Sequence, residues 1–278
     1  MIKKYELTDE TKVVMGHTLH RIRALKSFRA GTEDDTIDVD NGDSGGWIEQ
    51  ECNLSQSGTA WVDDTSCAFG NAAVADDALV AGYAMVYDRA RITGRARVTI
   101  SAKVFGNATV ITDDAYVWGD VCIYDWAYVC HDATVYEDSR VFGHALIGGF
   151  ASISGNVQAF GDAHIEGNAE ICGDSLIFGT ARVDGHANIF HSAVISAPEH
   201  VLTIDSLTSS HDCLTFFRSK DDANDICVAS SALGRYFYSV EDFDEKIPRI
   251  LQSQKKSADA KLYLLASALA KAQILKAD

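Results

Sequence analysis

Aliphatic residues recur at every sixth position through the middle of the chain, from Val62 to Ile195. The series takes one seven-residue step, between Val110 and Val117, and otherwise holds for 23 hexads with alanine in two of the places. A small residue, alanine in 18 cases, stands two positions before each of these residues. Because residues two apart lie on the same face of a strand, we expect both positions to face inward. The hexad therefore predicts one short strand followed by a corner.

Aromatic residues follow the same count and indicate how many hexads make one turn. They recur after 18 or 19 residues, which is about three hexads, so we expect every coil of a solenoid to carry a ring at the same point. Each ring directly follows an inward aliphatic residue and should point out of the coil. The predicted aromatic column consists of Phe69, Tyr87, Phe105, Tyr124, Phe142, Phe160 and Phe178.

An exposed column of this size is more apolar surface than an isolated soluble protein normally shows, so we expect something to cover it. Three covers are open from the sequence. The C-terminal helices of the same chain could lie along the column, the column could form the seam of a homotrimer, or it could line a ligand channel.

Glycine followed by Asn or Asp supplies turn chemistry at the predicted corners, as in Gly70-Asn71 and Gly161-Asp162. Proline is absent from the repeats, which fits a need for every backbone amide in coil-to-coil hydrogen bonds. This pattern resembles the hexapeptide-repeat superfamily of left-handed parallel β-helices, although the glycine comes one residue later than it commonly does there. The left hand is implied by the resemblance. We therefore expect an all-β solenoid with a β-rich N-terminal cap and a C-terminal appendage of β-strands and α-helices.

The chain outside the repeats predicts caps, because the open ends of a solenoid expose unpaired strand edges. Residues 1–58 should form the β-rich cap, 59–197 the left-handed β-helix, 198–240 a small β appendage and 241–278 amphipathic helices. An acidic loop over residues 33–43 is expected to be a solvated insertion. A divalent cation is the alternative for its carboxylates, which are Asp34, Asp35, Asp38, Asp40 and Asp43.

Three motifs near the N-terminus carry a closer resemblance. Ser44-Gly45-Gly46-Trp47, Asn53-Leu54-Ser55-Gln56 and Trp61-Val62 are similar to the entry segment of YdcK-like proteins. This hexapeptide-repeat family is labelled transferase-like and is also met in phage and prophage genomes. The resemblance covers most of the chain and implies a transferase or, in a phage setting, a protein that binds a host signalling nucleotide.

The composition limits the classes of partner and the cellular compartments that suit this protein. A formal net charge of −16 argues against broad binding to nucleic acid or to anionic membranes. Seven cysteines, an odd number without CxxC spacing, indicate a reducing compartment and predict no metal site. No secretory segment follows Met1 and no apolar run is long enough to span a bilayer, so we expect a cytoplasmic protein.

Four arginines fall within nine residues of this acidic chain, a cluster that suits phosphate or carboxylate. Arg95 is expected to stand one coil from Asp77 and Asp113, a charge ladder that needs no ligand. The column of Arg97 leads instead to aromatic rings on the same face, an arrangement that suits a nucleotide-like ligand, with plain surface packing and a subunit contact as the alternatives. The predicted ligand-binding residues are Arg89, Arg91, Arg97, Tyr116, Trp118 and Tyr136.

Histidines are the residues to consider for catalysis, because hexapeptide-repeat acyltransferases use one as a general base beside acyl-coenzyme A. His164 and His186 are the candidates, since they should share a face near Glu166 and Asp184. No loop interrupts the coils to build an acyl-coenzyme A site. The related zinc-dependent carbonic anhydrases need three converging histidines, and the columns of this chain supply no such triad.

These observations favour a homo-oligomer, most simply a trimer, that binds rather than transforms. The ligand is expected to be a small anionic, nucleotide-like molecule, or else a protein partner, and no cofactor is predicted. The alternatives are an acyl or acetyl transferase, which would use acyl-coenzyme A, and a purely structural spacer.

Overall fold

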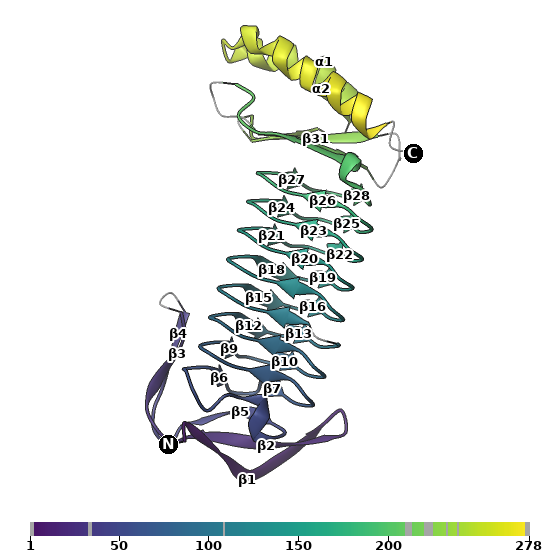
Figure 1. The fold of residues 1–278 in the computed structure, drawn as a ribbon. Coiled ribbons are helices and arrows are strands. Elements are labelled where there is room, and N and C mark those ends of the chain that lie inside the picture. The colour runs from purple at the N-terminus through teal and green to yellow at the C-terminus, as the bar shows by residue number, and fades with distance from the viewer. Residues whose placement is uncertain are drawn as a thin grey trace. The chain divides into compact units, whose positions relative to one another are not determined.

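The computed structural model describes residues 3–32, 35–107, 109–208, 213–219, 225–231, 233–237 and 239–275, with Asp35 and Arg235 described by their backbone alone. The chain divides into two compact units, Met1–Phe150 and Ala151–Asp278, which are described separately below. In both units the hexads form short parallel strands stacked coil upon coil (Figure 1). The chain is a left-handed parallel β-helix with a β-rich N-terminal cap and a C-terminal appendage of strands and helices, as the hexads and the resemblance predicted.

Each coil of the first unit has three faces, one strand to a face. Face 1 consists of β7 (Cys67–Ala68), β10 (Met85–Val86), β13 (Lys103–Val104), β16 (Cys122–Ile123) and β19 (Arg140–Val141). Face 2 consists of β8 (Ala73–Val74), β11 (Arg91–Ile92), β14 (Val110–Ile111), β17 (Tyr128–Val129) and β20 (Leu146–Ile147). Face 3 consists of β6 (Trp61–Val62), β9 (Leu79–Val80), β12 (Arg97–Ile100), β15 (Tyr116–Gly119) and β18 (Thr134–Glu137).

The interior of the coils is filled by the two residues that each hexad points inward. Ala90 and Ile92 on face 2, and Ala96 and Val98 on face 3, are all 0% exposed. A small residue beside a branched one fills a narrow interior without overpacking, and dense packing of this kind is the main source of stability for the coils.

The seven-residue step lies one hexad earlier than the sequence indicated. Ile111, not Val110, is fully buried and stands beside Ile92 in the ladder, while Val110 is paired with Arg91 and half-buried. The small inward residue of this hexad is Thr109, whose hydroxyl donates to the carbonyl oxygens of Phe105 and Asp125 at 2.6 and 2.9 Å. The expected inward position of Val110 is therefore wrong. Both residue pairs fit a small-x-aliphatic template, and the hydroxyl finds partners that make its burial inexpensive.

The corners hold residues in the left-handed backbone region, where glycine alternates with short polar residues. At the corner between faces 2 and 3, Asp76, Gly94 and Asp113 have φ values of 59°, 65° and 59°. The Gly94 backbone N–H donates to the Asp76 carboxylate at 3.1 Å, so the polar side chain ties one coil to the next. A Cβ on Gly94 would stand 2.6 Å from the backbone nitrogen of Asp113, which explains why this position has no side chain.

The N-terminal cap extends the face 1 sheet beyond the first coil. β5 (Ser44–Ile48) lies parallel to β7, and β2 (His17–Ala24) and β1 (Tyr5–Val14) follow it in antiparallel pairing. A single 3₁₀ turn, Glu51–Asn53, then leads toward the first strand of face 3. Lys4 is buried beneath the cap, where its Nζ donates to the carbonyl oxygen of Ala60 at 2.7 Å.

The acidic segment is not a simple loop. β3 (Phe28–Thr32) and β4 (Asp35–Val39) form an antiparallel hairpin, and the Phe28 ring packs edge-on against Trp61 with centroids 5.4 Å apart. The alternation of Ile37 and Val39 with acidic residues is a strand pattern, and it outweighs the charge of the segment. Of the five aspartates, Asp34 and the Asp35 side chain lie outside the described residues, and Asp38 is held by Arg29 at 2.8 Å.

The second unit continues the same three kinds of face. Its coil strands are β21 (Ser152–Ile153), β22 (Gln158–Ala159), β23 (His164–Ile165), β24 (Glu170–Ile171), β25 (Leu176–Ile177), β26 (Arg182–Val183), β27 (Asn188–Ile189) and β28 (Val194–Ile195). After the 3₁₀ turn Pro198–His200, an antiparallel sheet follows with β29 (Val201–Ile204), β30 (Leu214–Arg218), β31 (Ile226–Ser230) and β32 (Arg235–Phe237). The Asn188 backbone N–H donates to the Thr215 hydroxyl at 2.9 Å, so this sheet covers the open end of the last coil.

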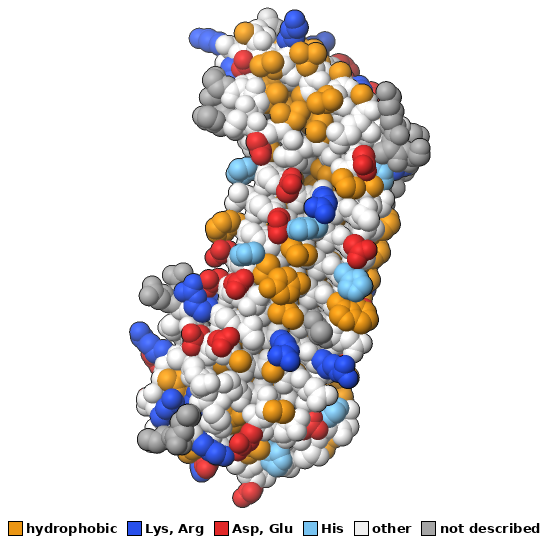
Figure 2. Space-filling view, viewed as in Figure 1, with side chains coloured by type: hydrophobic (Ala, Val, Ile, Leu, Met, Phe, Trp, Pro, Cys, Tyr) orange, Lys and Arg blue, Asp and Glu red, His pale blue; other side chains and the backbone are white. Residues whose placement is uncertain are grey.

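Two helices complete the second unit, α1 (Val240–Ser253) and α2 (Ala260–Ile274), with the 3₁₀ turn Ser257–Asp259 between them. The Ser239 hydroxyl accepts the Asp242 N–H at 3.1 Å and caps the start of α1. Both helices pack on the β29–β32 sheet, and hydrophobic side chains also gather on their outer surface (Figure 2). The described part of the chain contains no helix that is both long and apolar enough to cross a membrane.

Candidate functional site

A groove on face 3 of the first unit brings together several of the predicted ligand-binding residues. Arg97, Tyr116 and Thr134 occupy the same position of successive strands, because β12, β15 and β18 pair in parallel register. A hollow of about 360 Å³ lies over them. Its lining residues are Thr32, Arg95, Arg97, Asp114, Tyr116, Asp132 and Thr134.

The side chains at the centre of this hollow are a cation and an aromatic ring. The Arg97 guanidinium carbon lies 4.1 Å from the centroid of the Tyr116 ring, a cation–π arrangement. The Thr99 hydroxyl donates to the Tyr116 hydroxyl at 3.4 Å and helps to hold the ring. The hollow therefore holds a cation directly beside an aromatic ring.

The charge in the hollow is balanced rather than strongly positive. The Arg95 Nη2 lies 2.6 Å from Asp114 Oδ2, and Asp132 adds a second carboxylate. Asp114, not Asp113, is the partner of Arg95, because the seven-residue step shifts the next coil by one residue. Arg95 therefore pairs with a different aspartate from the predicted Asp113, and a highly charged anion would meet two carboxylates here.

A second, more apolar hollow of about 410 Å³ adjoins the first, and Tyr116 lines both. The β3–β4 hairpin supplies one wall of each hollow, through Thr32 in the first and Ile37 in the second. The other residues of the second hollow are Leu79, Ala81, Gly82, Tyr83, Thr99 and Ile100. We refer to the two hollows together as the face 3 groove. The sequence did not indicate Thr32 or Ile37, because the hairpin reaches face 3 only through the fold.

Trp118 and Tyr136 lie at the next outward position of face 3. Their rings stack with centroids 4.8 Å apart and an angle of 9° between them, and Trp118 lies 6.3 Å from the Tyr116 ring. Arg97, Tyr116, Trp118 and Tyr136 are therefore neighbours, as their spacing indicated. Trp118 and Tyr136 border the groove on this side without lining either hollow.

The other two predicted arginines lie elsewhere. Arg91 is exposed on face 2, where it pairs in register with Val110. Arg89 is exposed at the corner between faces 1 and 2, in a separate hollow of about 370 Å³ with His17 and Asp88. The four arginines thus point to two faces and two corners, and only Arg95 and Arg97 line the face 3 groove.

The aromatic column forms as predicted within each unit. The rings from Phe69 to Phe142 stack with centroid distances of 4.9–5.1 Å and angles of 2–9°, and Phe160 and Phe178 stack at 5.1 Å in the second unit. Stacking leaves the rings half-buried by one another, while Phe69 is covered by His17 of the cap. Partial burial raises the pKa of Tyr87 and of Tyr124. The stacked rings therefore contribute to the packing of the coils, and they present less apolar surface to solvent than isolated side chains would.

The C-terminal helices bury their apolar faces on the antiparallel sheet of their own unit. Phe243, Ile247 and Leu251 of α1 pack with Leu214 and Phe216 of the β29–β32 sheet. The hydrophobic cluster around both helices includes neither of the column rings of the second unit. Helix packing on the column therefore has no support within that unit.

The two candidate catalytic histidines lie in different surroundings. His164 is on β23, where its Nε2 lies 3.0 Å from Glu166. His186 lies one coil further along, just after β26, and its Nδ1 is 3.5 Å from Asp205 rather than near the expected Asp184. His186 and Asp205 line a hollow of about 460 Å³ with Asn168, Glu170, Ala187, Asn188, Ser206, Cys213 and Ser231. His164 does not line this hollow, so the two histidines do not form one site.

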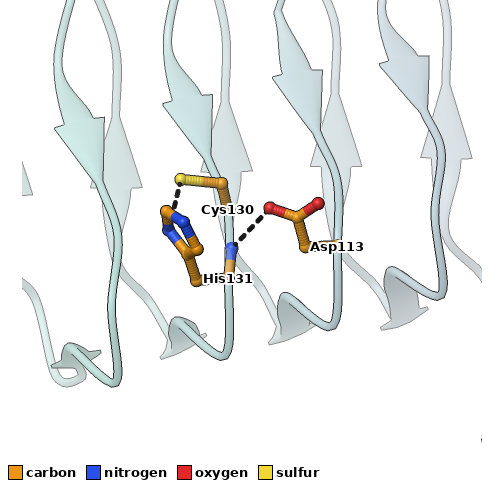
Figure 3. A group of neighbouring side chains, drawn as sticks. All are labelled: Asp113, Cys130 and His131. Atoms are coloured by element: carbon orange, nitrogen blue, oxygen red, sulfur yellow. Dashed lines mark hydrogen bonds between the residues drawn. The ribbon is translucent and has the colours of Figure 1, made fainter.

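A further cluster at the corner between faces 2 and 3 was missed by the sequence analysis. Asp113, Cys130 and His131 each offer one ligand atom, and these atoms all lie within 4.8 Å of one another (Figure 3). Asp113 and His131 are 18 residues apart and occupy the same corner of successive coils. The 18-residue spacing is a signal for the Asp113–His131 pair, whereas no CxxC spacing marks Cys130 as a ligand.

No protein-family model matches the chain, and a search of curated proteins finds no match either.

Proposed function

We propose that this protein is a non-catalytic binding protein whose face 3 groove holds a small nucleotide-like ligand, with a planar ring and one anionic group. The observation that carries this proposal is the Arg97 guanidinium stacked on Tyr116 at 4.1 Å, at the point where the two hollows meet. Two hollows of about 360 and 410 Å³ fall within the range of small-molecule sites.

The two hollows suit the two parts of such a ligand. The second hollow, with Leu79, Ile100 and Ile37, accepts an apolar planar group against Tyr116. The first offers the Arg97 cation to an acidic group. Because Asp114 and Asp132 line the same hollow, a singly phosphorylated or carboxylated ligand fits better than a triphosphate.

Isothermal titration calorimetry with GMP, AMP, GTP and guanosine tests the proposal. A nucleoside monophosphate should bind more tightly than GTP and than the nucleoside, and Arg97→Ala should weaken its binding by at least about tenfold, the loss of one charge-assisted contact. Arg91→Ala is the matched control, since that arginine is exposed on face 2. The proposal fails if none of the four compounds binds, or if Arg97→Ala and Arg91→Ala behave alike.

We further propose that the protein is a homo-oligomer, with the trimer implied by the resemblance to hexapeptide-repeat proteins as the first candidate. Support comes from the half-exposed rings of the column and from Trp126 and Tyr128, which are 51% and 38% exposed on the same coils. Native mass spectrometry reports the subunit number directly. A monomer at micromolar concentration would contradict the proposal.

An acyl or acetyl transferase is the second candidate, and one observation favours it. In this alternative, His186 in the hollow of about 460 Å³ is the general base, and Asp205 is the carboxylate that orients it. Release of free coenzyme A from acetyl-coenzyme A in the presence of amine and hydroxyl acceptors tests it. Activity that is lost in His186→Ala and kept in His164→Ala would replace the binding proposal with a transferase.

A further inference from the structure

We propose that Asp113, Cys130 and His131 hold a divalent cation that favours sulfur and nitrogen ligands, with Zn²⁺ as the best match. This inference goes beyond the proposed function and does not depend on the face 3 groove.

The donor atoms are already close to the geometry that a zinc ion needs. The Cys130 Sγ and the His131 Nδ1 are 3.1 Å apart. A tetrahedral zinc with bonds of about 2.3 Å to sulfur and about 2.0 Å to nitrogen places these two atoms about 3.5 Å apart. A separation larger by roughly half an ångström is within the reach of small side-chain rotations.

The third donor is oriented by the backbone. The His131 backbone N–H donates to Asp113 Oδ2 at 3.1 Å, which fixes the carboxylate and leaves Oδ1 for an ion. The Gly149 backbone nitrogen lies 3.5 Å from His131 Nδ1, at the limit of a hydrogen bond, so an ion bound to Nδ1 replaces only a weak hydrogen bond. Such supporting contacts are what position ligands in protein metal sites.

The chemistry of the set selects the ion. A thiolate, a neutral imidazole and a carboxylate together balance the charge of a divalent cation, and the mixed sulfur, nitrogen and oxygen set is typical of zinc rather than of magnesium or calcium. Cys130 is buried, whereas Asp113 and His131 are exposed, so an ion can enter from solvent and keep a water as its fourth ligand.

The cluster differs from the ordinary corner contacts of this protein. Asp76 and Asp88 also accept a backbone N–H from the next coil, at 3.1 Å each, but their partners there are Gly94 and Gly106. Of these three aspartates, Asp113 alone receives an imidazole and a thiol from the next coil. Within the described residues no second group of three such donors lies this close together.

The test uses the full-length protein, freed of metal with a chelator and titrated with Zn²⁺ against a chromophoric competitor. We expect one equivalent to bind, and we expect Co²⁺ at the same site to show the sulfur-to-cobalt charge-transfer absorption of a thiolate complex. Cys130→Ser and His131→Asn should each weaken Zn²⁺ binding by at least about tenfold, and Cys130→Ser should abolish the charge-transfer band. Asparagine suits position 131 because it tolerates the left-handed backbone that this corner requires.

Two variants serve as controls. Cys122→Ser removes a half-buried thiol of face 1, and Asp76→Asn removes a carboxylate from the same corner column, so neither should change the binding. Circular dichroism confirms that each variant is folded. The proposal is overturned if the wild-type protein binds no equivalent of Zn²⁺, or if a folded Cys130→Ser retains both the affinity and the cobalt band.

Discussion

The position of the seven-residue step determines which side chains meet on face 2 and at the corner between faces 2 and 3, and a pair of neighbouring substitutions tests it. Ile111 is 0% exposed and lies beside Ile92 inside the coil, whereas the adjacent Val110 is half-buried on the outside. Ile111→Ala removes three buried carbon atoms, worth about 0.8 kcal/mol each before the cavity is counted. We therefore expect it to lower the free energy of unfolding by about 3 kcal/mol.

Val110→Ala is the matched comparison at the next position. It removes two carbon atoms that are partly in contact with water already, and its cost should stay below about 1 kcal/mol. Urea unfolding followed by circular dichroism, with equal slopes required for the comparison, measures both values. If Val110→Ala proves the more costly of the two, the step lies where the hexad count placed it, and the partner of Arg95 is assigned wrongly.

Three further predictions concern other parts of the first unit. Burial lowers the pKa of Lys4 from 10.5 to about 8, so between pH 8 and 10.5 the unfolded chain binds more protons than the folded one. The free energy of unfolding of the wild type should therefore rise with pH in this range, relative to Lys4→Met, by up to about 3 kcal/mol. Parallel pH profiles from urea unfolding of the two proteins would contradict this. Tyr124→Ala removes a ring that stacks on Phe105 and Phe142 at 5.0 and 4.9 Å, and it should lower the free energy of unfolding by about 2 kcal/mol. Tyr83→Ala is the control, because this ring is 72% exposed, and it should lower the free energy of unfolding by less than about 0.5 kcal/mol. Gly94→Ala places a Cβ 2.6 Å from the backbone nitrogen of Asp113, so it should lower the melting temperature clearly more than Gly42→Ala. Gly42 also has a positive φ, but no atom lies within 4 Å of its Cβ position. Equal shifts for the two variants would show that backbone conformation alone determines the loss of stability.

Much of the fold could be predicted because each coil repeats the same local physics. The inward positions of Ala96 and Val98, and the stacking of Tyr87 on Phe105, follow from periods of two, six and 18 residues along the chain. The neighbours of Arg97 followed in the same way, since parallel strands in register bring equivalent positions together.

The parts that could not be predicted depend on contacts outside the repeat. The choice between Val110 and Ile111 is decided by hydrogen bonds of the Thr109 hydroxyl, which no hydrophobic pattern records. The contribution of Thr32 and Ile37 to the face 3 groove requires the hairpin to lie along that face, and Asp205 reaches His186 from beyond the coils. Sites built from two different parts of the chain are therefore the ones that periodicity could not find.

Saturation-transfer difference NMR with GMP tests the binding account most directly, because it reports contact between a ligand base and protein rings. Irradiating the aromatic protein resonances should transfer saturation to the base proton in the wild type and in Tyr128→Leu, a substitution at an exposed ring of face 2. Tyr116→Leu should abolish the transfer, since Tyr116 is the wall that both hollows share. Transfer that persists undiminished in a folded Tyr116→Leu, or that is absent from the wild type, would contradict the assignment of the face 3 groove as the ligand site.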